Sequence, residues 1–319
     1  MLTPRLPLYI PCVYNCFMYF GVTAAWKLRL TTPSARLFSL GRIAEAAAAG
    51  LLAELFYAPY DIVGAKFLWW TWHDTDAAIA ERLLGVPIGS SMWVITFVAV
   101  FSMALRGVLG AAIEDPTARP SAGRLLLGLG LISCLCSPAM IVVMSTFTTI
   151  ASAGLPSVPA LVLLLLTFLG LVAYGLSQSP PLHPPRRRDM LMAVAVLIYF
   201  SVFSMLMGLG NPLQHVSTGV HQPIGPPHLT TVDMLGFERR RFFNPSDFDE
   251  DFSFLCVGSA PQIPQAEADP LDWYTVCGRA HSNFPLYSAA VSFLAFFGII
   301  IYSFAFGLYS SADPKGKFD

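Results

Sequence analysis

Long apolar runs, separated by short polar or charged segments, are the main pattern along this chain of 319 residues. A helix needs about 20 mostly apolar residues to cross the hydrocarbon core of a bilayer. The pattern predicts an all-α membrane protein, a bundle of about seven transmembrane helices. Their expected ranges are Pro7 to Trp26, Leu37 to Tyr57, Ile88 to Ala112, Leu125 to Ala151, Val158 to Ser177, Met190 to Leu209 and Leu286 to Tyr309.

The fourth and fifth runs have the clearest pattern, because no charged residue occurs between Arg124 and Arg186. Residues 154–157, Gly-Leu-Pro-Ser, have the composition of a tight turn between two helices. The second run is the least regular, since it contains Arg42, Glu45 and Glu54.

Composition supports a membrane class and one domain. Hydrophobic residues make up 55% of the chain and charged residues 12%, about half of the usual charged fraction of a soluble domain. The formal net charge of −1 gives no indication of nucleic acid as a partner. We expect a single polytopic membrane domain over residues 1–319, with residues 211–284 forming a loop insertion.

The distribution of basic residues predicts the orientation of the bundle, because cytoplasmic loops are enriched in Lys and Arg. The amino terminus and the long loop are therefore expected outside the cytoplasm, and the carboxyl terminus inside. The basic residues on the expected cytoplasmic side are Lys27, Arg29, Arg36, Arg119, Arg124, Arg186, Arg187, Arg188, Lys315 and Lys317.

The first apolar run has a second interpretation. Arg5, the run itself and the small residues Thr23-Ala24-Ala25 have the general pattern of a signal peptide with a cleavage site. Cleavage there would leave six spans with the same orientation.

The long loop contains Cys256 and Cys277, the two cysteines outside the apolar runs. An oxidising compartment permits a disulfide, so the pair is predicted to be bonded, with two free thiols as the alternative. The loop also contains His215, His221 and His228 and an acidic run, but their spacing matches no zinc or calcium loop, and we predict no metal site and no cofactor.

The segment from Glu54 to Asp76 contains the candidate chemistry. Glu54 and Asp61 are seven residues apart and would share one face of a helix, although Pro59 between them is expected to bend it. Ionisable groups at membrane depth are costly and usually functional. Together with His73 these two carboxylates are the candidate catalytic residues.

Aromatic residues surround these carboxylates in the sequence. The candidate substrate-binding residues are Tyr57, Tyr60, Trp69, Trp70, Trp72 and Trp93. Arg82 is the expected counter-charge for the acids, and a structural ion pair is predicted among Asp74, Asp76 and Arg82. Asp74 or Thr75 is expected to cap a short helix running to Leu84.

Part of the chain, Glu54 to Trp93, resembles a carotenoid-biosynthesis membrane family that includes the bisanhydrobacterioruberin hydratases and, more remotely, the heterodimeric lycopene cyclases. The similarity consists of a carboxylate in a Tyr-punctuated helix, an aromatic block, Gly85-Val86-Pro87-Ile88 and Trp93. The cyclases have paired glutamates where this chain has Ile88-Gly89-Ser90-Ser91. The resemblance therefore implies a hydratase-like role for Glu54 rather than cyclisation. The segment Trp69 to Asp76 also resembles an uncharacterised eukaryotic multi-pass family, which implies no activity.

Three functions remain open from the sequence. The first is a membrane protein that binds or transforms an isoprenoid or other lipid beside Glu54, with membrane lipids as partners. The second is a non-catalytic subunit or scaffold with a protein partner or an oligomeric state. The third is a proton- or ion-coupled transporter. Lipid handling requires a lipid-sized cavity that contacts Glu54. A scaffold requires a filled core. Transport requires carboxylates that water reaches from both sides.

Overall fold

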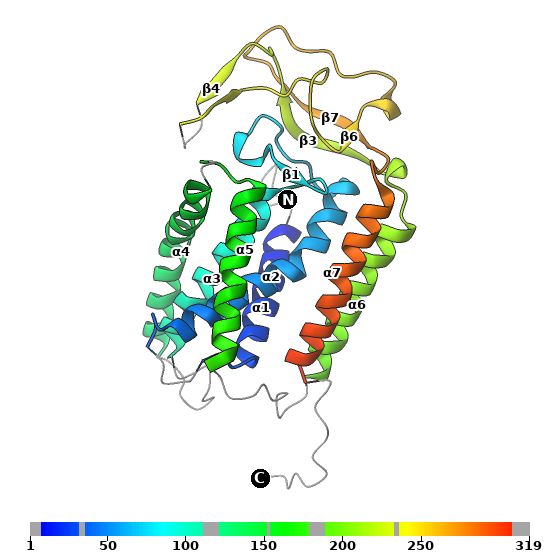
Figure 1. Cartoon of the computed structure of the whole chain (residues 1–319). Coiled ribbons are helices and arrows are strands. Elements are labelled where there is room, and N and C mark those ends of the chain that lie inside the picture. Colours follow the sequence, from blue (N-terminus) through cyan, green and yellow to red (C-terminus); the bar gives the residue numbers. More distant parts are fainter. Residues whose placement is uncertain are drawn as a thin grey trace.

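The computed structural model describes residues 8–31, 36–110, 121–151, 154–178, 189–232 and 236–307. Seven α-helices in these ranges form a bundle, and a layer of short strands covers one end of it (Figure 1). The helices are α1 (Tyr9–Lys27), α2 (Leu40–Lys66), α3 (Ile88–Leu109), α4 (Ala122–Ile150), α5 (Val158–Gln178), α6 (Met190–Leu209) and α7 (Phe284–Ala305).

Six of these helices, α2 to α7, are long and apolar enough to cross a membrane. The protein is therefore a multi-pass helical membrane protein with six candidate spans, one fewer than the sequence predicts. Helix α1, which is not among the six, has 19 residues and contains three tyrosines, Asn15 and Lys27. It packs along α2, where Gly21 lies against Ala49 and Ala53. Arg5, on which the signal-peptide alternative depends, lies outside the described residues.

Helix α2 is the central helix of the bundle, and α1, α3, α5, α6 and α7 all contact it. Its sequence is rich in alanine, and most of its residues are buried. Small side chains allow close helix approach, and Gly50 lies against the backbone of Ile95 in α3. The helix continues through Pro59 to Lys66, beyond the end at Tyr57 that the sequence predicts.

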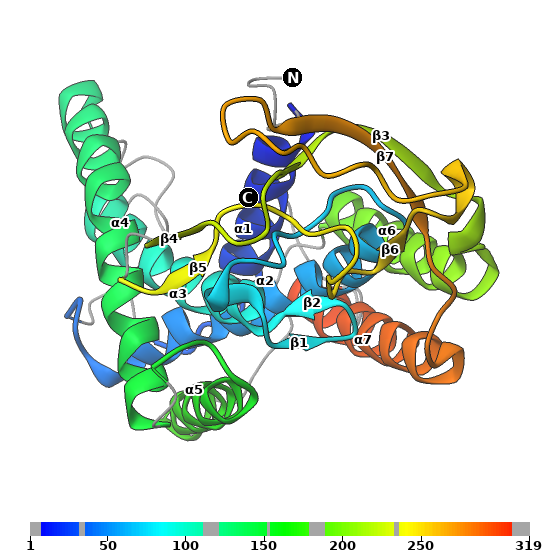
Figure 2. The same cartoon turned by 90° about the horizontal axis from the view of Figure 1, so that it is seen from above.

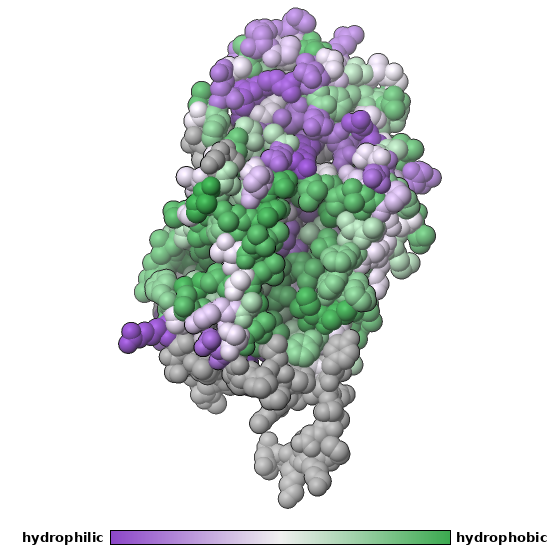
Figure 3. Space-filling view, viewed as in Figure 1, coloured by the Kyte–Doolittle hydropathy of each residue, from purple (hydrophilic) through white to green (hydrophobic). Residues whose placement is uncertain are grey.

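The outward faces of α4, α5, α6 and α7 are apolar, and Figure 3 shows a broad hydrophobic band over the bundle. Exposed leucines, valines, isoleucines and phenylalanines form this band. Such a surface is expected where lipid replaces water as the solvent. The strand layer at one end is largely hydrophilic in the same view.

The described part of residues 211–283, here called the cap, forms that strand layer. Its main sheet has the order β3-β7-β6, and all pairs are antiparallel. A cluster that includes Phe243, Phe252, Phe254 and Tyr274 gives the cap its own core. The strands are β3 (Val216–Ile224), β4 (Thr230–Val232), β5 (Glu238–Arg240), β6 (Phe252–Ser253) and β7 (Leu271–Gly278).

The predicted disulfide between Cys256 and Cys277 is present in the cap. It joins a short 3-10 turn, Leu255–Val257, to strand β7. Closing a loop of 21 residues stabilises a fold by about 3 kcal/mol in the chain-entropy model.

The connection from α2 to α3 differs from the predicted short helix ending at Leu84. A single 3-10 turn, Ala77–Ile79, is capped by Asp76, and a hairpin of β1 (Arg82–Leu83) and β2 (Val86–Pro87) follows. Leu84 and Gly85 form the hairpin turn with φ angles of 53° and 80°. Glycine adopts such angles without strain, so Gly85 favours a turn where a helix would otherwise continue.

Contacts at the two ends of the bundle establish the direction in which α1 and α7 run. Near the cap, the Tyr9 hydroxyl at the start of α1 donates to the Trp69 carbonyl at 2.7 Å. At the opposite end, Lys27 lies 3.7 Å from Asp189 and over the ring of Phe306. Helix α1 therefore begins at the cap end, and α7 ends at the opposite end.

Candidate functional site

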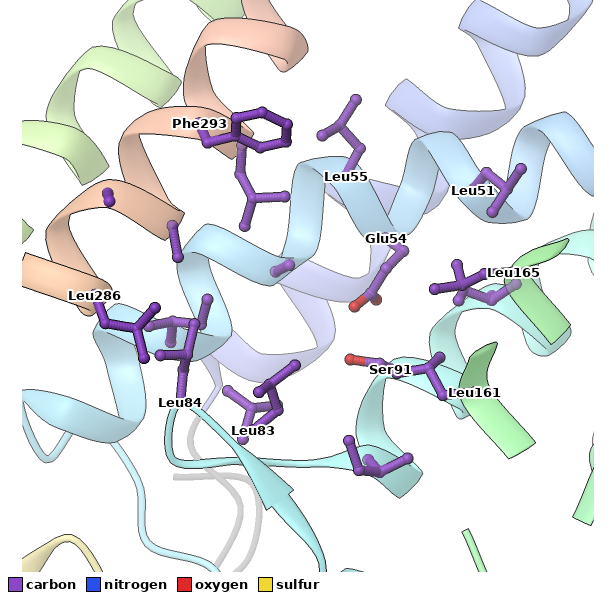
Figure 4. Close-up of a pocket in the computed structure, with 18 residues that line it drawn as sticks. Leu51, Glu54, Leu55, Leu83, Leu84, Ser91, Leu161, Leu165, Leu286 and Phe293 are labelled. Carbon is purple, nitrogen blue, oxygen red and sulfur yellow. The ribbon is translucent and has the colours of Figure 1, made fainter. Parts of the chain in front are cut away.

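One face of α2 lines a cavity of about 660 Å³ between α2, α3, α5 and α7. Leu51, Glu54, Leu55, Ala58 and Ile62 recur at the spacing of one helix face and line it. Figure 4 shows Leu51, Glu54 and Leu55 on this helix. The volume lies within the range of small-molecule sites, about 300–1,000 Å³. We call this space the Glu54 cavity.

The side chains that line the Glu54 cavity are mainly apolar, and the cavity opens between α5 and α7 (Figure 3). Leu161 and Leu165 of α5 border it on one side, and Phe293 and Leu294 of α7 on the other. Figure 3 shows a hollow in the hydrophobic band between the columns of α5 and α7. The β1–β2 hairpin supplies Leu83, Leu84 and Val86 at the cap end.

Glu54 and Ser91 are the two polar residues among the described residues that line the cavity. Figure 4 shows the Glu54 carboxylate and the Ser91 hydroxyl facing each other across it, and the two side chains are hydrogen-bonded. The second oxygen of Glu54, Oε2, is buried and has no hydrogen-bond partner among the described residues. A buried acceptor without a partner carries a cost that a suitably placed ligand group would remove.

Asp61 lies about 10 Å beyond Glu54 along α2, at 1.5 Å per residue. It contacts Ser90, the residue before Ser91. The Ser90 hydroxyl donates to Asp61 Oδ2 at 2.7 Å, and Tyr57 contributes a further hydrogen bond. Asp61 is buried and does not line the Glu54 cavity. The first turn of α3 thus binds both predicted carboxylates through adjacent serines.

The predicted substrate-binding aromatics do not line the Glu54 cavity. Tyr57 packs on Phe17 of α1, and Trp93 stacks on Phe97 and contacts Tyr14. These residues form part of the core of the bundle rather than of the cavity.

The tryptophans after α2 are likewise separate from the cavity. Tyr60 contacts both Trp69 and Trp70, and Trp70 lies tightly over Gly64. Trp72 lines a small space beside Arg82 and Glu250. The side chain of His73 is exposed, and the structure does not bring it to Glu54.

The predicted ion pair among Asp74, Asp76 and Arg82 is wrong, because each side chain has a different main partner. Arg82 donates from Nη1 and Nη2 to the two carboxylate oxygens of Glu250, at 2.7 and 2.8 Å. Asp74 lies 3.1 Å from Arg240, and Asp76 accepts from the backbone of Ala78. Arg82 and Asp74 have partners in the cap because the cap folds over the connection between α2 and α3.

Two neighbouring acids of the cap attach it to the bundle. Glu250 binds Arg82 in the hairpin, while Asp251 lies 3.0 Å from the Nζ atom of Lys66 at the end of α2. Lys66 also donates to the carbonyl of Ala280. These contacts hold the β1–β2 hairpin, and therefore the cap end of the Glu54 cavity, in place.

Stability is expected to depend on pH through Glu250. Burial raises the pKa of Glu250 to about 7 from 4.5, although its bonds to Arg82 lower it. Between these values the folded chain binds a proton that the unfolded chain releases, so the free energy of unfolding falls as pH rises from about 5 to 8. The expected decrease is at most about 3 kcal/mol.

Thermal unfolding in detergent across this pH range measures the effect. Glu250→Gln should flatten the slope relative to the unsubstituted protein, whereas Glu238→Gln, at an exposed position in β5, should leave it unchanged. Equal slopes in all three proteins would exclude Glu250 as the titrating group.

A second buried charge cluster lies toward the other end of the bundle. Glu45 accepts from Arg106 Nε at 2.7 Å and Nη2 at 2.8 Å, and Arg42 lies 3.5 Å away. Arg42 and Glu45, one turn apart on α2, pair with each other, and Arg106 is the further partner that sequence reasoning missed. An arginine inside an apolar run was the available signal, because such residues pair within the bundle.

The described residues contain no group of three His, Cys, Asp or Glu side chains that could hold a metal ion. Ser90, Ser91, Glu250 and Asp251 are further residues that sequence reasoning did not single out. The two serines follow directly on the start of α3 and carry no pattern in the sequence that marks them. The cap acids carry none either, because their partners are more than 160 residues away in the sequence.

Comparison with known proteins identifies a family but no activity. A family model described as "Domain of unknown function (DUF7802)" matches residues 1–306. The chain belongs to the DUF7802 family. No curated protein and no solved structure matches the chain. The carotenoid-biosynthesis resemblance therefore stays unconfirmed, and membership of the DUF7802 family does not indicate a substrate.

Proposed function

We propose that the protein binds a membrane lipid in the Glu54 cavity, with the Glu54 carboxylate hydrogen-bonded to the polar group of the lipid. One observation carries this proposal: an apolar cavity of about 660 Å³ within the bundle contains a buried carboxylate oxygen without a partner. The hollow between α5 and α7 provides a route from the surrounding bilayer (Figure 3). A scaffold would instead be expected to have a filled core.

A transport function has less support from the geometry. Glu45 is fully engaged with two arginines, and the space beside these three side chains has no measurable volume. Asp61 is hydrogen-bonded in the core.

We further propose that the cap lies outside the cytoplasm and that α1 crosses the membrane as a seventh span. The end of α1 and the starts of α2 and α4 lie at the end of the bundle opposite the cap (Figure 1). The described basic residues next to these helix ends are Lys27, Arg29, Arg36 and Arg124. Basic residues favour the cytoplasmic side. The disulfide of the cap favours an oxidising compartment, which agrees with this orientation.

Lipid mass spectrometry on protein extracted directly into nanodiscs tests the proposed function. The unsubstituted protein should retain one lipid species well above its bulk abundance, and Glu54→Gln should retain less of it. Ala290→Phe, which places a ring in the cavity, should remove it. Ala139→Phe, on the exposed face of α4, is the matched control and should retain it.

The outcome that would contradict the proposal is a bulk-like lipid profile that is the same in all four proteins. A species that is retained equally by the unsubstituted protein and by Ala290→Phe would place the lipid elsewhere on the surface.

A further inference from the structure

We propose that the ligand of the Glu54 cavity is an uncharged lipid that carries a hydroxyl group, and not a phospholipid or a fatty acid. This inference rests on the lipid-binding function proposed above and specifies its substrate class. Three features support it: the absence of cations in the lining, the closed cap end and the hydrogen-bonding capacity of Glu54 and Ser91.

The first feature concerns charge. No Lys, Arg or His occurs among the described residues that line the cavity. The nearest cationic side chains of the cap end are engaged, since Lys66 binds Asp251 and Arg82 binds Glu250. A phosphate or carboxylate beside Glu54 would therefore lack a counter-charge in a medium of low dielectric constant, where an unpaired charge is most costly.

The second feature is the position of the polar group. Glu54 lies near the middle of α2, separated by about 18 Å of helix from Lys66 at the cap end. Leu83, Leu84 and Val86 of the β1–β2 hairpin lie across the cap end of the cavity. A zwitterionic headgroup that contacts Glu54 could not also reach water there. A small uncharged polar group does not need to reach water in this way.

The third feature is the hydrogen-bonding pattern. Glu54 Oε2 has no partner and can accept a hydrogen bond, and the Ser91 hydroxyl donates to the same carboxylate. A lipid hydroxyl can donate to Glu54 Oε2 while Ser91 keeps its bond to the carboxylate, whereas a carbonyl group can only accept and cannot bind Oε2. The pair therefore matches an alcohol, with its hydrocarbon part extending between α5 and α7.

Photoaffinity labelling of the full chain in nanodiscs tests this inference. Three probes with the same diazirine-bearing alkyl chain differ only in the polar end: a primary alcohol, a carboxylic acid and a phosphatidylcholine ester. The alcohol is expected to label the cavity segments of α2, α5 and α7 about tenfold more than either other probe. Glu54→Leu should lower alcohol labelling about tenfold, which corresponds to about 1.4 kcal/mol.

Two variants separate the possible failures. Ala290→Phe should abolish labelling by every probe, and Thr167→Val, on the exposed face of α5, should leave it unchanged. Equal labelling of the cavity by all three probes, or alcohol labelling that Glu54→Leu does not alter, would overturn the hydroxyl-lipid inference and leave lipid binding intact. Labelling no stronger than in Ala290→Phe for every probe would overturn both.

Discussion

Replacement of Glu45 by leucine is expected to lower the free energy of unfolding by about 3–5 kcal/mol, the usual cost of breaking a buried ion pair. Glu45 is 1% exposed and provides the carboxylate for Arg106 and Arg42. The Arg106 guanidinium also lies 4.9 Å from the ring centre of Trp26. Without Glu45, both guanidinium groups would lose the buried carboxylate that they share.

Equilibrium unfolding in detergent micelles measures this decrease in the free energy of unfolding, and two further variants serve as comparisons. Adding Arg106→Met to Glu45→Leu should recover part of the stability, because one of the two buried cations that lost the Glu45 carboxylate is removed. Glu238→Leu, at an exposed position of the cap, should change the stability by less than about 0.5 kcal/mol. If Glu45→Leu costs no more than Glu238→Leu, the cluster contributes little and our account of this end of the bundle is wrong.

Replacement of Pro245 by alanine is expected to convert an unmodified protein into one that is fully glycosylated at Asn244. Asn244-Pro245-Ser246 lacks only a permitted middle residue to be an acceptor sequon. Ser246 is exposed in the cap, and Asn244 is partly exposed. If the cap lies outside the cytoplasm, as proposed, the oligosaccharide enzymes of the secretory pathway meet this site during synthesis.

A gel-mobility shift that a glycosidase reverses is the measurement. The variant Pro245→Ala/Ser246→Ala, which loses the acceptor serine, is the control and should run unmodified. A sequon appended after Asp319 should stay unmodified as well, because that end is proposed to be cytoplasmic. Modification of the appended sequon together with an unmodified Pro245→Ala protein would invert the orientation.

The apolar runs predict most of the bundle because a membrane span must be both long and apolar. Helices α4, α5 and α6 begin and end within a few residues of the predicted limits. Helix α2 was predicted too short, because Pro59, Asp61 and Lys66 interrupt its apolar pattern. Asp61 Oδ2 accepts from Ser90 and Lys66 binds Asp251, and both partners come from other parts of the chain.

The candidate site could be predicted only in part. Glu54 was singled out because a carboxylate within an apolar run is costly, and the structure places it at a cavity. Whether Tyr57, Trp70 or His73 joins it depends on which side of α2 each neighbouring helix occupies. That arrangement is set by packing between helices far apart in the sequence. The same limit applies to Arg82, whose acid partner Glu250 becomes available only when the cap folds.

The central claim is that the Glu54 cavity holds a lipid, and an electron cryomicroscopy structure of the protein in native-membrane nanodiscs tests it most directly. Our account predicts elongated density between α5 and α7 that reaches hydrogen-bonding distance of the Glu54 carboxylate, and its loss in Ala290→Phe. A cavity that is filled by the side chains of α2, α5 and α7 in native membranes would contradict the account.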